Sequence, residues 1–457
     1  MSEKFCKPSY DIRHFAEHLV QVNQLAAVVF TDAVESATGE PLVAAGQPMD
    51  DKARQLLIAQ PDAPDFLSRI SVAGGLTANQ LVDDIKAYIE ADPALLNFSK
   101  VHFDFDDLKP LANRLDECQP IIVQLSVMKI QLPMVYAQAL FCAWLGALLM
   151  RQLKRSDNDV FYVFLLALVH DIGLLHVPVE YVKSRKQFNY KQLQVLQLHT
   201  LAGFEVLKAI SNIPEATLRS VAEHHENLDG TGYPAGKVGN SISRFGQCLN
   251  FLDAINAIYN KRIKPGERPM RDLIPMIQMN GHSRFGVLGK KLIEWLKGMP
   301  APKVRAVPNV LMPFLIQSVR DRNGYITSCV DIMDKLSADI GFRHGDARVF
   351  ALQNTIIHIN ISITQSGIIN IAYMRWLDQV EAEGLAHAYR EVEDVFLMMQ
   401  EVIYHIGKLK NQIEYFLTTP CESSEAYKLK RGLERLERVV LPQIHPNLEI
   451  LWIANVH

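Results

Sequence analysis

The sequence predicts a mainly α-helical protein built from three parts. From about residue 119 to residue 298, apolar segments of about 10 to 20 residues alternate with polar loops, which is typical of a helical bundle. From residue 299 onward the pattern is again helical, whereas residues 1–118 mix helix and strand signals. We therefore expect a helical bundle at 119–298, flanked by a small mixed α/β region at 1–118 and a helical C-terminal domain at 299–457.

The first of these parts carries no recognisable chemistry. The segment VESATGEPLVAAGQPMDDKARQLL predicts a turn, a short strand, a second turn and a helix. We assign residues 1–118 to a regulatory or partner-binding region whose role the sequence does not specify.

Length and charge limit the possible functions. At 457 residues the chain is long enough for two or three domains, because single hydrophobic cores stop growing at roughly 250 to 300 residues. The net charge is −3, from 47 Lys and Arg against 50 Asp and Glu. Such a balance provides no overall positive surface for nucleic acid or for an acidic membrane. We expect no nucleic-acid partner, and a phosphate-bearing ligand must be bound locally.

Cysteine usage and the N-terminus predict a reduced, cytoplasmic protein. The six cysteines form no C-x-x-C pair, and the opening residues MSEKFCKPSY lack the apolar core of a signal peptide. One stretch, Met134–Met150, is apolar enough to resemble a membrane span, but it is slightly shorter than the ~20 residues that a bilayer requires. We expect a buried core helix there and no membrane span.

The C-terminal domain begins after the proline-rich segment KGMPAPKVRAVPNV and contains a regular apolar series. Steps of four and three predict two helices, separated near Pro420, that pack along a coiled-coil-like seam. The seam is either an intramolecular helical hairpin or a contact with another chain. The series consists of Leu385, Tyr389, Val392, Phe396, Met399, Ile403 and Ile406, followed by Leu429, Leu433, Leu436 and Val440.

Metal-competent side chains gather in the central part. The segment FLLALVHDIGLLHVP ends an apolar helix in His170 and Asp171, and His199 projects from the apolar face of a later helix. Each feature alone is more typical of a hydrogen-bonded core residue than of a ligand. Taken singly, neither predicts a site.

The segment HHENLDGTGYP changes that interpretation. It places His224 and His225 side by side before a turn, and Asp253 follows among the apolar residues of a predicted buried helix. Adjacent side chains on a helix point about 100° apart, so both imidazoles can reach one object only where the helix ends or the object is large. An unpaired buried carboxylate costs several kcal/mol or becomes protonated. Four imidazoles and two carboxylates in a helical core therefore predict a bound metal.

These motifs resemble the HD-GYP family, the metal-dependent phosphodiesterases of bacterial cyclic di-GMP signalling. The resemblance covers about 160 residues, from Gln138 to Gly298, and the HHE, DG and GYP block is its most specific part. It implies an HD-type helical bundle with one or two divalent transition metals, iron or manganese, and cyclic di-GMP or a related nucleotide as ligand. By position, it implies metal ligands at His170, Asp171, His199, His224, His225 and Asp253, of which Asp171 bridges and His170 and Asp171 are catalytic, and substrate contacts at Gly232, Tyr233, Pro234 and Arg262.

Three positions depart from the family pattern. Gln138 stands where the resemblance implies the first ligand histidine, and a carboxamide is a poorer ligand than an imidazole. Leu174 replaces a lysine after the HDIG motif, and Asn256 replaces a downstream carboxylate. All three changes remove a ligand or a charge from the same site, which is typical of reduced catalysis.

Three functions follow from this pattern. If the site is active, two metals that share Asp171 would activate a water for in-line attack on a phosphodiester, opening cyclic di-GMP to a linear dinucleotide. Alternatively, the bundle binds metal or nucleotide as a sensor or partner-docking module and passes its state to a protein partner, or to a second copy, through the C-terminal helices. A scaffold without a small ligand is the third interpretation. Elemental analysis beside a turnover assay separates them.

Overall fold

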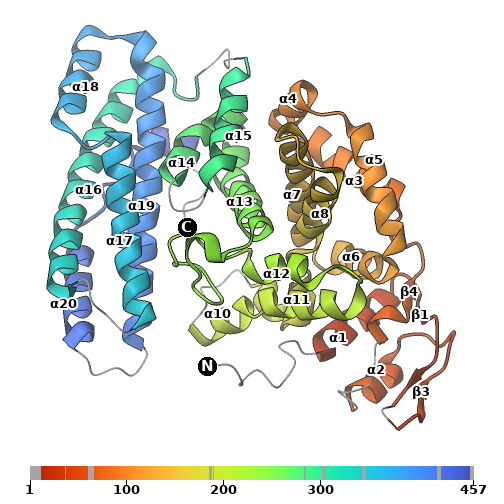
Figure 1. Ribbon diagram of the computed structural model, residues 1–457. Coiled ribbons are helices and arrows are strands. Elements are labelled where there is room, and N and C mark those ends of the chain that lie inside the picture. The colour runs from red at the N-terminus through yellow and green to blue at the C-terminus, as the bar shows by residue number, and fades with distance from the viewer. Residues whose placement is uncertain are drawn as a thin grey trace. The chain divides into compact units, whose positions relative to one another are not determined.

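The computed structural model describes residues 12–36, 38–59, 66–184, 188, 190–281, 285–300, 305–341, 346–418 and 424–452. The opening segment with Cys6, and the Pro420–Cys421 connection, lie outside the described residues. The secondary structure is mainly α-helical, which confirms the predicted fold class (Figure 1). By packing, the chain forms two compact units: the first comprises residues 1–226, 233–235 and 241–256, and the second comprises 227–232, 236–240 and 257–457.

The N-terminal part of the first unit combines short strands with helices. Strand β1 pairs antiparallel with β4, and β2 pairs antiparallel with β3. Asp50 caps α2 by accepting the amide of Ala53, and Thr77 caps α3 through a capping box with Gln80. Strand β3 and helix α2 confirm the predicted strand and helix. The bounds are α1 Ile12–Asn23, β1 Val28–Phe30, β2 Val34–Glu35, β3 Pro41–Val43, α2 Asp51–Ile58, β4 Ile70–Val72, α3 Ala78–Glu90, α4 Pro93–His102 and α5 Lys109–Asn113.

Most of the remaining first unit is a helical bundle. Its centre is the pair α7 and α8, which approach closely at Gly146, where an added Cβ would lie 2.8 Å from Cγ1 of Val163. The bounds are α6 Gln119–Gln131, α7 Pro133–Gln152, α8 Asp157–Val169, η4 Ile172–His176, α9 Val179–Val182, α10 Tyr190–Gln197, α11 His199–Ile210, α12 Glu215–Glu223 and α13 Arg244–Ile258.

Two segments of this bundle are long and apolar enough to cross a membrane by composition. They are Pro133–Gln152 and Asp157–His176, and within the protein their apolar windows are 78% and 89% buried. Such burial is typical of core helices, as predicted for the first of them, while the second was not anticipated from the sequence. The absence of membrane spans and the cytoplasmic location remain predictions.

Two glycines bring η4 directly onto α11. A Cβ added to Gly173 would lie 1.9 Å from the carbonyl oxygen of His199 and 2.6 Å from the amide nitrogen of Gly203. A Cβ added to Gly203 would in turn lie 3.3 Å from the amide nitrogen of Gly173. No side chain fits between these backbones, so the glycine after the His-Asp pair and the glycine four residues after His199 set the distance between Asp171 and His199.

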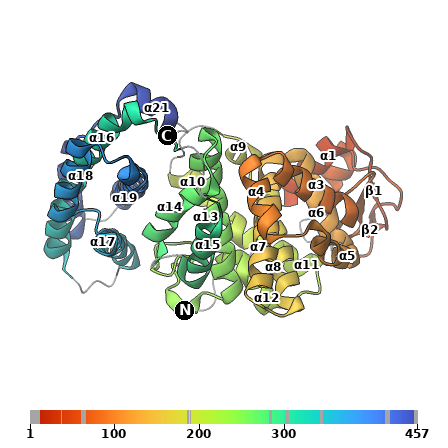
Figure 2. The ribbon, with the colours of Figure 1, turned by 90° about the horizontal axis from the view of Figure 1, so that it is seen from above.

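The second unit is built around long helices. Helices α16, α17 and α19 lie side by side, and α20 packs on α16 and α19 (Figure 1 and Figure 2). Gly432 allows that close approach, since its added Cβ would lie 2.8 Å from the Cδ atoms of Leu336. The bounds are η6 Tyr259–Ile263, η8 Met270–Asp272, α14 Leu273–Met279, α15 Gly286–Gly298, α16 Met312–Ile340, α17 Ala347–Ser366, α18 Ile371–Glu383, α19 Tyr389–Thr418, α20 Ser424–Arg438 and α21 Pro446–Trp452.

The predicted apolar seam lies on α19 and α20. Val392, Phe396, Met399 and Ile406 are buried in the core of this unit, whereas Val440 follows α20 and is 81% exposed. Because the seam packs within the chain, the hairpin interpretation agrees with the structure; a contact with another chain remains a prediction. The domain boundaries at residues 118 and 298 also remain predictions, and by packing η6, α14 and α15 belong with the C-terminal helices.

Candidate metal centre

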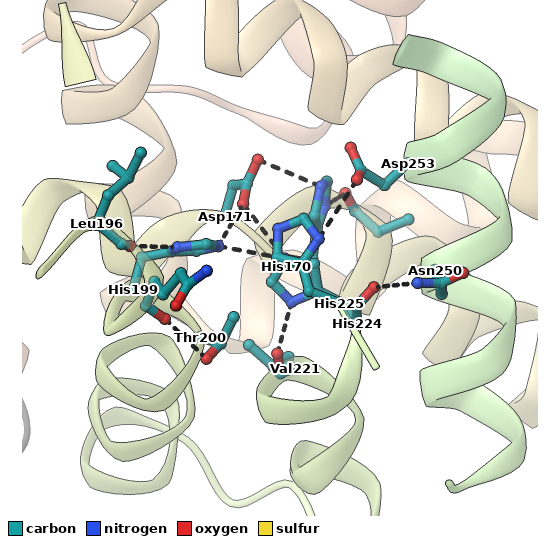
Figure 3. A network of polar contacts seen from close by, with 12 residues as sticks. His170, Asp171, Leu196, His199, Thr200, Val221, His224, His225, Asn250 and Asp253 are labelled. Carbon is teal, nitrogen blue, oxygen red and sulfur yellow. Dashed lines mark hydrogen bonds and ion pairs between the residues drawn. The ribbon is translucent and has the colours of Figure 1, made fainter. Parts of the chain in front are cut away.

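Five of the six predicted ligands lie at or next to helix ends that converge in the first unit, and the sixth, Asp253, lies within α13 (Figure 3). His170 is the C-cap of α8, and His199 is the first residue of α11. His224 is the C-cap of α12, which ends at Glu223. Because the helix stops there, His224 and His225 turn toward the same place, and their ring centroids lie 4.0 Å apart. The adjacent histidines therefore converge because their helix is ending.

Backbone carbonyls fix the tautomers of three imidazoles. In each ring Nδ1 donates its proton to the carbonyl of the residue three positions earlier, at 2.6 to 2.8 Å. A carbonyl oxygen only accepts, so in the neutral ring Nδ1 carries the proton and Nε2 keeps its lone pair. The pairs are His170 with Ala167, His199 with Leu196, and His224 with Val221.

The Nε2 atoms of His199 and His224 lie close to each other and to the carboxylate of Asp171. Oδ1 of Asp171 lies 3.2 Å from Nε2 of His199 and 3.4 Å from Nε2 of His224, and the two Nε2 atoms are 3.3 Å apart. All three side chains are buried, with exposed fractions of 8%, 4% and 0% for Asp171, His199 and His224. Buried acceptors that face one another are unfavourable unless a cation or a proton lies between them. This geometry fits a divalent metal.

The other oxygen of Asp171 faces His170, and Asp253 lies beside His225. Nε2 of His170 lies 3.4 Å from Oδ2 of Asp171, and Nδ1 of His225 lies 3.7 Å from Oδ2 of Asp253. Four of the predicted ligands, Asp171, His199, His224 and His225, offer ligand atoms that all lie within 4.8 Å of one another. The structure thus brings one four-residue set together and places His170 and Asp253 at its border.

The protonation states suit metal binding. Burial raises the pKa of the Asp171 carboxyl, but the nearby imidazoles of His170, His199 and His224 outweigh it and hold that pKa well below its usual range. Burial lowers the pKa of His224, and burial with the neighbouring imidazoles lowers the pKa of His225 well below its usual value. A charged carboxylate and neutral imidazoles are the forms that coordinate metals.

Tyr233 lies beside the cluster. Its amide donates to the carbonyl of His225 at 3.1 Å, and its ring centroid lies 4.7 Å from that of His225. Gly232 precedes it and Pro234 follows it in the same turn, so the three predicted substrate contacts share one loop. Their role as substrate contacts remains a prediction.

Comparison with known proteins identifies one family match. Residues 124–287 match the family described as HD domain. This part of the chain is therefore similar to an HD domain, and it is called the HD domain below. The HD family is metal-dependent, and the chain holds a cluster of the corresponding donor types.

Several characterised proteins are similar to the HD domain. A 3′3′-cGAMP-specific phosphodiesterase of Vibrio cholerae is 31% identical over 137 residues, which cover 30% of this chain and 29% of that protein. Cyclic di-GMP phosphodiesterases of Thermotoga maritima and Pseudomonas aeruginosa are 26% and 30% identical, over 30% and 31% of this chain and 37% and 34% of theirs. The chain thus spans about a third of the length of these relatives. The predicted resemblance to HD-GYP proteins is confirmed.

A solved structure is also similar in part. A cyclic GMP-AMP-specific phosphodiesterase of Vibrio cholerae covers 65% of this chain and 92% of its own, with 14% identity and a TM-score of 0.27. That score is too low to inform the site.

The structure places the remaining predicted site residues elsewhere. Arg262 lies in η6 and forms an ion pair with the buried Glu401 of α19, within the second unit. Its guanidinium thus already has an anionic partner, and its role as a phosphate contact remains a prediction. Gln138 is half-buried on α7, Leu174 is 9% exposed in η4, and Asn256 is fully buried in α13, one turn after Asp253.

Two buried carboxylates near the cluster were not assigned a role from the sequence. Glu226 accepts the amide of Ala235 at 2.6 Å, and Glu223 accepts the amide of Ser243 at 2.9 Å. Both hold the loop that follows α12 in place. The only feature of the sequence that pointed to Glu226 was its place in the HHE motif. The partners of both carboxylates are backbone amides, which a pattern of side chains cannot identify.

Proposed function

We propose that the HD domain is a metal-dependent phosphodiesterase that acts on a cyclic dinucleotide, cyclic di-GMP or cGAMP. The observation that supports it is the set of acceptor atoms formed by Asp171, His199 and His224, which suits a bound cation. The names of the similar proteins support the substrate class.

Each residue of the cluster has a distinct role in this proposal. Oδ1 of Asp171 faces His199 and His224, and Oδ2 faces His170, so Asp171 could serve as a ligand to both metals. His199, His224 and His225 would hold one metal, and His170 with Asp253 the other. The metals proposed are iron or manganese, which imidazole and carboxylate ligands both suit. When bound, they supply Lewis-acid activation of water and neutralisation of phosphate charge.

The protein itself prepares the site before substrate binds. The carbonyls of Ala167, Leu196 and Val221 hold three imidazoles with Nε2 directed inward, and this fixed orientation needs no reorganisation when a metal or substrate arrives. Tyr233, whose ring lies beside that of His225, would contact the nucleotide. The buried surroundings exclude bulk water and strengthen every electrostatic contact within the site.

A binding function is the second candidate, and Gln138 favours it. This residue stands on α7 where the resemblance implies an imidazole, so the second metal would have fewer ligands than the first. In addition, Arg262, the residue proposed to bind phosphate, already forms an ion pair with Glu401. With these departures, the HD domain would bind metal and nucleotide and report their presence without rapid turnover.

A hydrolysis assay with cyclic di-GMP and 3′3′-cGAMP tests the proposal. The metal-loaded wild type should yield a linear dinucleotide, and Asp171→Asn should abolish turnover. Asp116→Asn, an exposed change in the same compact unit, is the matched control and should retain it. Binding of either nucleotide without turnover would favour the second candidate. Turnover that persists in Asp171→Asn would contradict the proposed site.

A further inference from the structure

The C-terminal helices contact the loop that carries the GYP turn. Nδ2 of Asn354, on α17, donates to the carbonyl oxygen of Asp229 at 2.5 Å, although the two residues are 125 positions apart. The next residue, Gly230, has a φ of +77°, and a Cβ added to it would lie 2.9 Å from Cγ2 of Val238 and 3.8 Å from Nδ2 of Asn354. Both partners belong to the second compact unit.

Several local bonds hold the loop, which is defined here as residues 227–239. Asp229 accepts the amide and the hydroxyl of Thr231 at 3.0 and 2.6 Å. The amide of Gly230 donates to Asn227 at 2.9 Å, and that of Gly239 donates to Leu228 at 2.8 Å. These bonds join residues within 227–231 and link residue 228 to residue 239. The bond from Asn354 is different, because it joins the loop to a helix that is distant in the sequence.

Asn354 is surrounded by apolar side chains on its face of α17. On α17 it shares one helical face with Phe350, Ile357 and Ile361, at spacings of four, three and four. Those three apolar side chains are 48%, 41% and 38% exposed. Asn354 is thus a polar residue within an apolar stripe of α17, at the position where its side chain can donate to the carbonyl of Asp229.

The attached turn is close in sequence to the candidate site. Only Thr231 and Gly232 separate Gly230 from Tyr233, whose ring and amide contact His225. A shift of the turn can therefore reach Tyr233 through a short stretch of backbone.

We propose that Asn354 is a positioning residue of the HD domain, through which the C-terminal helices fix the loop and hence Tyr233 for nucleotide binding. The effect on nucleotide rests on the proposed function. The attachment of the loop does not.

Two substitutions and one control test this inference. Asn354→Ala removes the donor, and Asn354→Asp keeps the size but places a carboxylate oxygen against the Asp229 carbonyl. Asn360→Ala is the matched control, because Asn360 lies on the same helix and its amide donates to Asp334 at 2.7 Å. Amide hydrogen exchange of residues 227–239, metal content and KM for cyclic di-GMP are measured for all four proteins.

We expect faster exchange in the loop for both Asn354 variants, with metal content unchanged and KM raised roughly two- to tenfold, as befits one lost hydrogen bond. Asn360→Ala should match the wild type in all three. A lower melting temperature without faster loop exchange would mean a merely structural role and overturn the inference. If the wild type neither binds nor hydrolyses cyclic dinucleotides, the proposed function fails, while loop exchange still decides whether Asn354 holds the loop.

Discussion

The Nε2 atoms of His199 and His224 face each other at 3.3 Å, and both lie against the same oxygen of Asp171. Each ring donates its Nδ1 proton to a backbone carbonyl, so neither Nε2 carries a proton in the neutral state. A metal ion resolves this contact between acceptors. The carbonyls thus do for the imidazoles what a carboxylate does in many metal sites: they orient the ring and set its tautomer.

Gly173 should be irreplaceable, because its missing side chain sets the distance between Asp171 and His199. In Gly173→Ala the added Cβ would meet the backbone of His199 and Gly203, which cannot move without displacing α11. We expect a loss of at least about 3 kcal/mol in unfolding free energy and much reduced metal content. Urea denaturation measures the first and elemental analysis the second.

Gly324→Ala provides the control for that substitution. Gly324 lies within α16, and its added Cβ would have no neighbour within 4 Å. Alanine there should stabilise the protein by about 0.5 to 1 kcal/mol. Equal effects of the two changes would show that the contact between η4 and α11 does not set the site.

His176 should make stability depend on pH. Burial lowers the pKa of His176 to about 3, from 6.5. Between these values the unfolded chain binds a proton that the folded chain does not, so stability falls as pH falls below about 6.5. At pH 5 the loss from this residue should approach about 2 kcal/mol.

Urea denaturation at pH 5 and pH 7 tests this dependence. His176→Gln removes the titrating group, so its stability should change less between the two pH values than that of the wild type. His387→Gln, at an exposed position in the 3-10 helix η11 (Ala386–Ala388), should behave like the wild type. An unchanged pH dependence in His176→Gln would assign the effect to other groups.

The Arg262–Glu401 pair should stabilise the second unit. Burial raises the pKa of Glu401, but Arg262, His405 and Asn280 outweigh it and keep the carboxyl ionised. Asn280 donates to Glu401 at 2.8 Å, so the carboxylate has partners on both oxygens. Glu401→Gln leaves the largely buried guanidinium without its counter-charge, at a cost of about 3 to 5 kcal/mol.

A double-mutant cycle with Arg262→Met measures that coupling. The double variant should be more stable than Glu401→Gln alone, because it no longer buries an unpaired charge. Additive losses would show that the two side chains do not interact in solution.

The departures at Gln138 and Leu174 should limit catalysis. Gln138→His restores an imidazole, and Leu174→Lys restores an ammonium group. Together they should raise metal occupancy from about one toward two and increase hydrolysis of cyclic di-GMP at least tenfold, which is ~1.4 kcal/mol. The single changes should each give less than the pair. Because Leu174 is only 9% exposed, the melting temperature of each variant is the necessary control.

A contrary result is equally informative here. Fast hydrolysis by the wild type that the double change leaves unaltered would mean that neither position limits the reaction. Ligands other than those assigned would then complete the site.

The sequence predicted which side chains cluster better than it predicted their surroundings. His199, His224 and Asp171 were candidates because imidazoles and carboxylates in apolar helices need a common cation, and the structure brings them together. The carbonyls that orient them could not, since every residue has one. Gly173 and Gly203 were visible in the motifs. The sequence did not show why glycine is needed there, because the backbone contact between η4 and α11 depends on packing between distant segments.

The sequence also did not predict contacts between residues that are far apart in the chain. Arg262 was assigned to a phosphate from its position, while Glu401, which pairs with it, lies 139 residues later on a helix chosen for its apolar seam. The contact of Asn354 with Asp229 likewise gives no local signal. The hairpin of α19 and α20 was foreseeable, because its seven-residue spacing is local.

The most direct test of the central claim is the metal content of protein purified without added metal. We predict about one transition-metal ion per wild-type chain, and a loss of most of it in His224→Ala, since removing one ligand typically lowers affinity 10- to 100-fold or more. His387→Ala, at the exposed site, should retain the wild-type content. Metal absent from the wild type, or retained undiminished in His224→Ala, would contradict the assignment of Asp171, His199, His224 and His225 as a metal centre.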